Sequence, residues 1–322
     1  MHLLLSRNVQ QIIPMGVDLL REEGYVMESR AGEVVTVRGP VTSFYERPTE
    51  RVIFWPERDA NPFFHFMEGL WMLDGRNDVE WISRYNSTIE QFSDNGRTFN
   101  GAYGHRWRHY FGYDQLNTVI DKLRANPEDR RVMLQMWHPD DMVMDSKDLP
   151  CNQSVNFRIV SGQVDMTVFN RSNDMIWGAY GANAVHMSML QEYVALSLGL
   201  EVGGYWQIST NFHAYHSTWD KVESIEYTDK VDDPYESRQV EPFKMMHSPK
   251  EQWDGELEMF MDEGTSAMGY RDPFFKKVVL PMAQTWDAWK EKDMASAMKF
   301  AKDIGANDWQ RACLEWLARR NK

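Results

Sequence analysis

The chain has 322 residues, of which 43% are hydrophobic and 13% aromatic. This length can bury a substantial core in one large domain or in two of ordinary size, and the aromatic content argues against disorder. The net charge of -13 argues against a general nucleic-acid-coating role, because nonspecific binding depends on Lys and Arg neutralising phosphates.

Cysteine usage and hydropathy favour a cytoplasmic protein. The two cysteines, Cys151 and Cys313, lie far apart in sequence and do not form the pattern of a disulfide framework. No apolar run approaches the roughly 20 residues that span a bilayer. Residues 1–14 lack the basic stretch and the small-residue cleavage site of a signal peptide.

Strand-like and helix-like patterns alternate in the first part of the chain. Residues 25–55 are rich in Val, Thr, Tyr and Phe with Gly and Pro between them, which indicates strands and turns. Residues 62–85 carry apolar side chains at helical spacing after a Pro. Residues 114–131 predict another helix, which Asn126-Pro127 ends.

Three strand-like stretches follow. Their residue ranges are 130–137, 154–160 and 163–170. The second and third are separated by Ser161-Gly162, which is typical of a tight hairpin.

The clearest helix of the chain is predicted at residues 184–200, with Gly203-Gly204 closing it. Residues 205–216 form a further strand candidate, and residues 274–320 look helical. The overall pattern predicts an α+β fold, in which an antiparallel or mixed sheet packs on one long buried helix.

Cys151, in the segment LPCNQ, is the first candidate for chemistry. A lone cysteine is more often an inert core residue than a nucleophile. A free thiol is only a few per cent thiolate at neutral pH, so a nucleophilic role requires a nearby cation. Arg171, at the end of the strand after the hairpin, is the cation that the sequence offers.

Several arginines lie in turns, where they are usually solvated surface charge. Arg30 lies in a Gly-containing turn, Arg130 and Arg131 follow another turn, and Arg171 is followed by Ser172. Arginine forks and a hydroxyl donor are also what a phosphate monoester needs. Both interpretations are open for each of these arginines.

Six segments follow one another along the chain: MEGLWMLDGRND (67–78), NGAYGHRWR (100–108), LPCNQ (149–153), NRSND (170–174), GAYGAN (178–183) and HAYH (213–216). In this collinear order they resemble the thymidylate synthase superfamily, and within it the phage-type deoxypyrimidine monophosphate hydroxymethylases. The resemblance covers roughly residues 20–225. It implies a catalytic domain at 1–225 with that superfamily's mixed sheet on a long buried helix, and a helical extension at 226–322 packed on the same domain.

The resemblance assigns a role to each matching position. It implies that Cys151 is the nucleophile, that Asn183 reads the pyrimidine edge, and that Asp174 is the acid of the Arg-Ser-x-Asp motif. The remaining roles fall into three groups: Glu68 and Tyr103 for water and proton transfer; Arg171, Ser172, Arg30, Arg130 and Arg131 for phosphate, the Arg130–Arg131 pair coming from the partner of a homodimer; and His213 and Tyr215 for the sugar 3′-hydroxyl.

The implied chemistry is one-carbon transfer from 5,10-methylenetetrahydrofolate to C5 of a pyrimidine deoxynucleoside monophosphate, without a metal. A thiolate that adds at C6 makes C5 nucleophilic, and loss of folate then leaves an exocyclic methylene. Arg171 has two expected tasks, lowering the thiol pKa and gripping the phosphate. Glu68, if buried, has a raised pKa suited to proton transfer.

Departures from the family bear on the product. Asn152 follows the nucleophile where thymidylate synthases carry His, the segment from Asp174 to Asn183 is one residue longer, and the usual C-terminal lid has no counterpart. A site without that lid admits water, which favours hydroxymethylation over the alternative, reductive methylation to dTMP. The Asn183 amide favours dUMP, but flipped it serves dCMP.

Two other classes of function remain as alternatives. A nucleotide- or RNA-binding module on the same scaffold would not need Cys151. A metal hydrolase would use the groups at His138, Asp140 and Asp141 or at His213 and His216, but the HPDD segment is typical of a turn.

Overall fold

Two β-sheets and the helices that cover them make up the computed structural model, which describes residues 1–228 and 231–321. The larger sheet has the strand order β1 (His2–Ser6), β4 (Val41–Tyr45), β9 (Glu201–Ser209), β7 (Gln163–Asn170), β6 (Asn152–Val160) and β5 (Met133–Gln135). The smaller sheet has the order β2 (Tyr25–Ser29), β3 (Gly32–Thr36), β10 (Phe212–Tyr215) and β8 (Asn173–Asp174).

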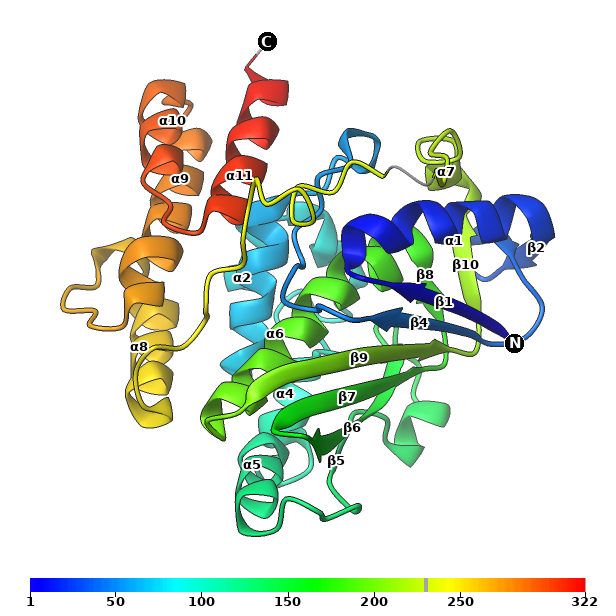
Figure 1. Ribbon diagram of the computed structural model, residues 1–322, viewed down its shortest axis with the longest axis horizontal. Helices are drawn as coiled ribbons and strands as arrows, with labels where there is room; N and C mark the ends of the chain where they lie inside the picture. Colours follow the sequence, from blue (N-terminus) through cyan, green and yellow to red (C-terminus); the bar gives the residue numbers. More distant parts are fainter. Residues whose placement is uncertain (229–230, 322) are drawn as a thin grey trace.

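Most of the helices pack on one side of the larger sheet, as Figure 1 shows. The helices are α1 (Val9–Glu23), α2 (Pro62–Leu73), α3 (Val79–Ser83), α4 (Tyr103–His105), α5 (Gln115–Ala125), α6 (Asn183–Ser197), α7 (His216–Trp219), α8 (Lys250–Glu263), α9 (Leu280–Lys290), α10 (Met294–Lys302) and α11 (Asn307–Arg320). None of the helices in the described ranges is long and apolar enough to cross a membrane.

The larger sheet mixes parallel and antiparallel neighbours, as the sequence predicted. Strands β6 and β7 form an antiparallel hairpin, whereas β7 and β9 are parallel. The hairpin turns at Ser161 and Gly162, which both have positive φ, the conformation that a two-residue hairpin turn requires. This hairpin fixes which residues face each other at the start of β6 and the end of β7.

Helix α6 is the long buried helix of the prediction. Residues 183–195 are all buried, and the helix lies between the larger sheet and α2 (Figure 1). It ends at Ser197, where Gly199 takes a positive φ. The prediction that Gly203-Gly204 closes the helix was wrong, because both glycines lie inside β9.

The predicted strand at 205–216 is two strands in different sheets. β9 ends at Ser209 in the larger sheet, and β10 begins at Phe212 in the smaller one. Two turn residues therefore carry the chain from one sheet to the other. This change of sheet brings His213 and Tyr215 alongside β8.

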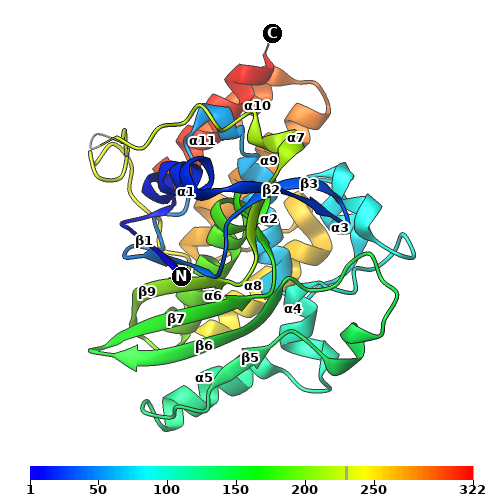
Figure 2. The same ribbon diagram turned by 90° about the vertical axis from the view of Figure 1, so that its right-hand side faces the viewer.

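Helices α8 to α11 form an outer layer on α2, on the side away from the larger sheet (Figures 1 and 2). Trp309 of α11 packs edge-on against Phe66 of α2, with ring centroids 5.1 Å apart. Arg51 hydrogen-bonds Glu192 of α6, whose second oxygen accepts the backbone N–H of Met245. The two predicted regions share one apolar core, and the boundary near residue 225 stays a prediction. Residues 229, 230 and 322 of the predicted extension lie outside the described residues.

A substitution in this shared core tests whether the layer is integral to the fold. Trp309 is 7% exposed, so Trp309→Ala should lower the free energy of unfolding by about 3–5 kcal/mol. Urea unfolding should remain one transition when it is followed by circular dichroism. Met268→Ala is the control, because Met268 is 88% exposed. A separate early transition for residues 231–321 would contradict one shared core.

Candidate active site

The β6–β7 hairpin brings Cys151 and Arg171 together. Asn152 pairs with Asn170, so the residues just outside this pair, Cys151 and Arg171, are also neighbours. The backbone N–H of Arg171 donates to the Cys151 carbonyl at 3.0 Å, and its Nη2 lies 3.9 Å from the Cys151 Sγ. The cation that the sequence predicted for this thiol is therefore in contact with it.

The Arg171 guanidinium is held by the segment that leads to the cysteine. Its Nε donates to the Pro150 carbonyl and its Nη2 to the Leu149 carbonyl, each at 3.0 Å. Burial raises the pKa of the Cys151 thiol, and Arg171 and Arg30 oppose this rise. The prediction that Arg171 lowers the thiol pKa has the right direction for Arg171, but burial outweighs it.

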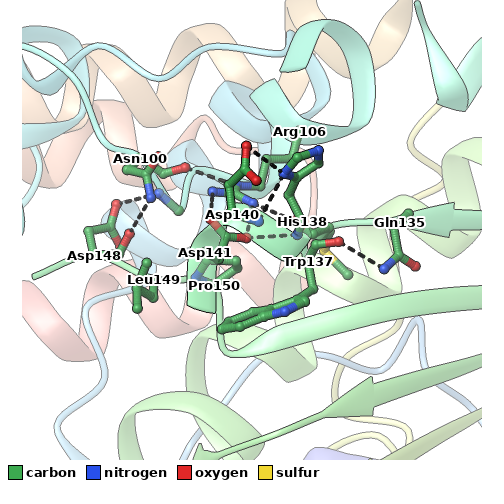
Figure 3. Close-up of polar contacts among 12 residues, drawn as sticks. Asn100, Arg106, Gln135, Trp137, His138, Asp140, Asp141, Asp148, Leu149 and Pro150 are labelled. Atoms are coloured by element: carbon green, nitrogen blue, oxygen red, sulfur yellow. Dashed lines mark hydrogen bonds and ion pairs between the residues drawn. The ribbon is translucent and has the colours of Figure 1, made fainter. Parts of the chain in front are cut away.

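A buried ion pair anchors the loop that carries Cys151 (Figure 3). Arg106 and Asp141 are joined by two hydrogen bonds of 2.7 and 2.8 Å, and both side chains are fully buried. Burial alone would raise the pKa of Asp141, but the hydrogen bond from Arg106 holds it below its ordinary value. Arg106 also donates to the carbonyls of Asn100 and Met136. The loop between β5 and β6 is thus fixed at its base.

Three ionisable side chains, Glu68, Tyr103 and Asp148, lie close to one another and to Cys151. Burial, together with the nearby charge of Asp148, raises the pKa of Glu68 to about 8. Burial also raises the pKa of Tyr103, and the nearby Cys151 adds to this rise. Asp148 is itself held by the backbone N–H of Gly101 at 2.7 Å. Glu68 is therefore mostly protonated at neutral pH.

His186 of α6 lies against Glu68. Its Nε2 is 3.2 Å from Glu68 Oε2 and 3.2 Å from the His65 carbonyl. Burial lowers the pKa of His186 to about 3, so the imidazole is neutral and this short contact is not an ion pair at neutral pH. A single ring N–H serves one acceptor well, and the His65 carbonyl takes it, which leaves Glu68 Oε2 without a hydrogen-bond partner among the described residues.

Strands β8 and β10 bring Asp174, His213 and Tyr215 together. Asp174 pairs with His213 across the two strands and accepts the backbone N–H of Tyr215 at 3.2 Å. Burial raises the pKa of Asp174, and burial likewise lowers that of His213. The Tyr215 hydroxyl is close enough to Cys151 and Arg30 for both charges to act on its pKa, which burial raises.

Asn183 lies behind the cysteine at the first turn of α6 and is 7% exposed. Its Oδ1 accepts from Asn152 Nδ2 at 3.4 Å, and its own Nδ2 donates to Asn173 Oδ1 at 3.0 Å. The residue at the family's His position, Asn152, therefore contacts the predicted base reader. Asn152 Oδ1 has no hydrogen-bond partner in the described part of the chain.

The predicted phosphate ligands do not all meet within one chain. Arg30 is exposed at the β2–β3 turn, and Ser172 is half-buried between β7 and β8. Arg130 and Arg131 are exposed on the loop between α5 and β5, where Asp129 holds Arg131 by hydrogen bonds of 2.8 and 2.9 Å.

The HPDD segment forms a turn, and its groups are not set for a metal. His138 Nδ1 accepts a hydrogen bond from the backbone N–H of Asp140, while the Asp141 carboxylate forms an ion pair with Arg106. Within residues 1–228 and 231–321, no three His, Cys, Asp or Glu side chains are grouped to hold a metal ion. A cavity of about 550 Å³ between α1 and β2 is lined by none of the predicted site residues.

The family model of thymidylate synthase matches residues 58–236, more than half of the chain. The chain belongs to the thymidylate synthase family. The family resemblance and the fold class that the motifs predicted are confirmed, with a helical C-terminal region in addition.

Phage enzymes are among the similar members of this thymidylate synthase family. A deoxyuridylate hydroxymethyltransferase of Pseudomonas phage M6 is 47% identical over 99% of this chain and 95% of its own length. The enzyme of the same name from Bacillus phage SP01 is 39% identical over 60% of this chain and 54% of its own. A putative thymidylate synthase of Methanothermobacter marburgensis is 29% identical over 67% of this chain and 91% of its own length. The likeness to the M6 enzyme thus extends through the C-terminal helices.

Proposed function

We propose that this protein is a deoxyuridylate hydroxymethyltransferase. It transfers a one-carbon unit from 5,10-methylenetetrahydrofolate to C5 of dUMP through a covalent bond between Cys151 and C6. The contact between the Cys151 sulfur and Arg171 carries this proposal. The near full-length likeness to the M6 enzyme supports both the substrate and the product.

The residues around Cys151 fit the steps of this reaction. The thiolate adds to C6 of the pyrimidine, and the electron pair moves to C5 and O4 as an enolate. When bound, the folate supplies a methylene group that C5 attacks. A base then takes the C5 proton, and departure of the folate amine leaves an exocyclic methylene on the ring. Arg171 neutralises the thiolate and the phosphate that lies beside it.

Water completes the proposed reaction. A water molecule adds its oxygen to the exocyclic methylene and gives its proton to a base of the site. This addition forms an enolate on the ring, and the electron pair of the enolate then expels the Cys151 thiolate from C6. Two buried acceptors support a bound water here: Glu68 Oε2 and Asn152 Oδ1 each lack a partner among the described residues. Buried oxygens of this kind usually bind ordered water.

The folate site is proposed next to Asp174. The indole of Trp177 is 53% exposed and lies over the buried Arg58, whose Cζ is 4.8 Å from the ring centroid. A flat exposed ring beside a carboxylate fits a pterin, which stacks through its face and donates hydrogen bonds through its edge. The residues present therefore fit the co-substrate.

We also propose a homodimer, formed through the outer face of the larger sheet. Leu3 and Leu5 are more than half exposed there, and Leu5 lies in register with the aromatic pair Phe44 and Trp206 across β4 and β9. Such an apolar face favours a partner of the same kind. The exposure of Arg130 and Arg131 supports their contact with the phosphate in the partner's site.

Reductive methylation to dTMP is the second candidate, because a putative thymidylate synthase is 29% identical over two thirds of this chain. A non-catalytic binding module is less favoured, because the contact between Cys151 and Arg171 would serve no purpose there. Incubation with 5-fluoro-dUMP and methylenetetrahydrofolate separates enzyme from module. The enzyme should form a covalent ternary adduct, with the nucleotide mapped to the Cys151 peptide by mass spectrometry. Failure to form that adduct would contradict the proposed function.

Glu68 gives a prediction for pH. Because its pKa is about 8 in the fold, against an ordinary value of 4.5, the fold holds a proton that the unfolded chain releases. This group's contribution to stability is therefore full below pH 4.5 and is lost as pH rises to about 8. Proton transfer by neutral Glu68 also predicts that kcat falls above a pH of about 8.

Glu68→Gln tests both parts of that prediction. It should lower kcat by about 10²–10⁴-fold at every pH, because the amide cannot transfer a proton, while KM for dUMP changes little. Its free energy of unfolding should vary less with pH than that of the wild type. A wild-type kcat in the Gln variant would exclude Glu68 from proton transfer.

A further inference from the structure

A chain of buried carboxamides leads away from Asn183 into the larger sheet. Asn183 Nδ2 donates to Asn173 Oδ1 at 3.0 Å, and Asn173 Nδ2 donates to Gln207 Oε1 at 2.6 Å. Gln207 Nε2 donates in turn to the backbone carbonyl of Ala179 at 3.1 Å. Asn173 and Gln207 are 2% and 0% exposed, so water does not replace these bonds.

The Ala179 carbonyl sets the direction of the whole chain. The oxygen and nitrogen of a carboxamide have the same shape, so the orientation of each amide follows from its partners. A carbonyl can only accept, so Gln207 must turn its nitrogen toward Ala179 and its oxygen toward Asn173. Asn173 then has its oxygen toward Asn183, and Asn183 has its nitrogen toward Asn173.

Asn152 holds the other end of Asn183. Its Nδ2 donates to Asn183 Oδ1 at 3.4 Å. If the Asn183 amide flipped, its oxygen would face the Asn173 oxygen and its nitrogen would face the Asn152 nitrogen. The bond to Asn173 would then be lost in a buried place, where unpaired polar groups are costly, whereas Asn152 could turn with Asn183 because its own Oδ1 has no partner among the described residues.

The turn before α6 is shaped around this chain of amides. A Cβ built on Gly178 would lie 2.6 Å from Asn173 Oδ1 and 3.4 Å from Asn183 Nδ2. The first distance is too short for any real side chain, so Gly178 leaves the room that Asn173 occupies. The backbone of the turn thus confines the same amide that the hydrogen bonds orient.

We infer that Gln207 and Asn173 act as positioning residues that lock Asn183 in one orientation, and that this lock makes the site select uracil over cytosine. The inference rests on the proposed function. Uracil presents a donor at N3 and an acceptor at O4, and cytosine presents the reverse at N3 and N4. Asn183 has one N–H and one lone pair left to bind the base. With its orientation fixed, these two groups can match either uracil or cytosine, but not both.

Gln207→Met tests the lock from a distance. Gln207 is separated from Asn183 by Asn173, and Met has a similar volume without hydrogen-bonding groups. Without its anchor, Asn173 can bond Ser209 in either orientation, since a hydroxyl both donates and accepts. The ratio of kcat/KM for dUMP to that for dCMP should therefore fall about tenfold or more, mostly by a gain or retention of activity on dCMP.

Gln191→Met is the matched control. Gln191 is also 0% exposed, and its Nε2 also donates to backbone carbonyls, those of Val164, Gly203 and Gly204 at 2.8–3.1 Å. It has no bond to the amide chain. Its replacement should lower the melting temperature as Gln207→Met does, but leave the ratio of dUMP to dCMP unchanged. An equal fall in both variants would show a general effect of stability and overturn the inference.

The remaining outcomes separate the lock from the proposed function. An active wild type together with an unchanged ratio in Gln207→Met would overturn the lock alone. A wild type that turns over neither nucleotide would overturn the proposed function. If Gln207→Met does not fold, Asn173→Ser replaces it: a hydroxyl both donates and accepts, so Asn183 can take either orientation, and the ratio should fall about two- to fivefold. An unchanged ratio there would overturn the lock.

Discussion

Cys151→Ala should lower kcat on dUMP by at least about 10⁴-fold, because no other group can activate C5 by adding to C6. The residues proposed to bind the phosphate and the sugar are unchanged in this variant, so the dissociation constant for dUMP should change by only a few fold. Steady-state kinetics with methylenetetrahydrofolate gives the first quantity, and equilibrium dialysis gives the second. Adduct formation with 5-fluoro-dUMP should be lost as well.

Cys313→Ala is the control for this loss. Cys313 is the other cysteine of the chain, and it lies in α11 at 0% exposure. Its replacement should cost some stability but leave kcat unchanged. If Cys151→Ala turned dUMP over at a rate near that of Cys313→Ala, the covalent mechanism would be excluded.

Asp141→Ala should lower the free energy of unfolding by about 3–5 kcal/mol, because it leaves the fully buried Arg106 without its counter-charge. The loop that this pair anchors leads to Cys151, so kcat should fall together with stability (Figure 3). Urea unfolding, monitored by tryptophan fluorescence, measures the first effect.

The neighbouring residue supplies a matched control. The Asp140 side chain is 73% exposed, and its one recorded contact with an ionisable group is with the His138 ring. Asp140→Ala should therefore change the free energy of unfolding by less than about 1 kcal/mol. The double variant Arg106→Met with Asp141→Leu should be more stable than Asp141→Ala, because it removes the buried charge along with its partner. Equal losses for Asp140→Ala and Asp141→Ala would contradict the assigned role.

The hairpin that brings Cys151 beside Arg171 was predictable from local sequence. The Ser161-Gly162 turn sets a two-residue hairpin, and the strand lengths on either side then place the end of β7 beside the start of β6. The helix at 183–197 was equally plain, because apolar side chains dominate residues 184–198 and no Pro or Gly interrupts them. Its end was mispredicted, because Gly203-Gly204 looks like a helix stop but lies where β9 passes close to Phe44 and Asp165.

Other parts of the site depend on contacts between distant segments. Asp148 looks like an ordinary loop acid, and only the fold shows it beside Glu68 and Tyr103. Gln207 and Asn173 look like a polar strand residue and a turn residue, although they are part of one buried chain. Burial also outweighs Arg171 in setting the pKa of the Cys151 thiol, a balance that sequence spacing cannot give.

The product formed from dUMP tests the proposed hydroxymethylation most directly. The protein is incubated with dUMP and methylenetetrahydrofolate in water enriched in heavy oxygen, and the nucleotide is then analysed by mass spectrometry. We expect a gain of CH2O in which the new oxygen comes from the solvent. A gain of CH2 alone, with dihydrofolate released, would show that hydride rather than water reaches the exocyclic methylene, and would contradict the proposal.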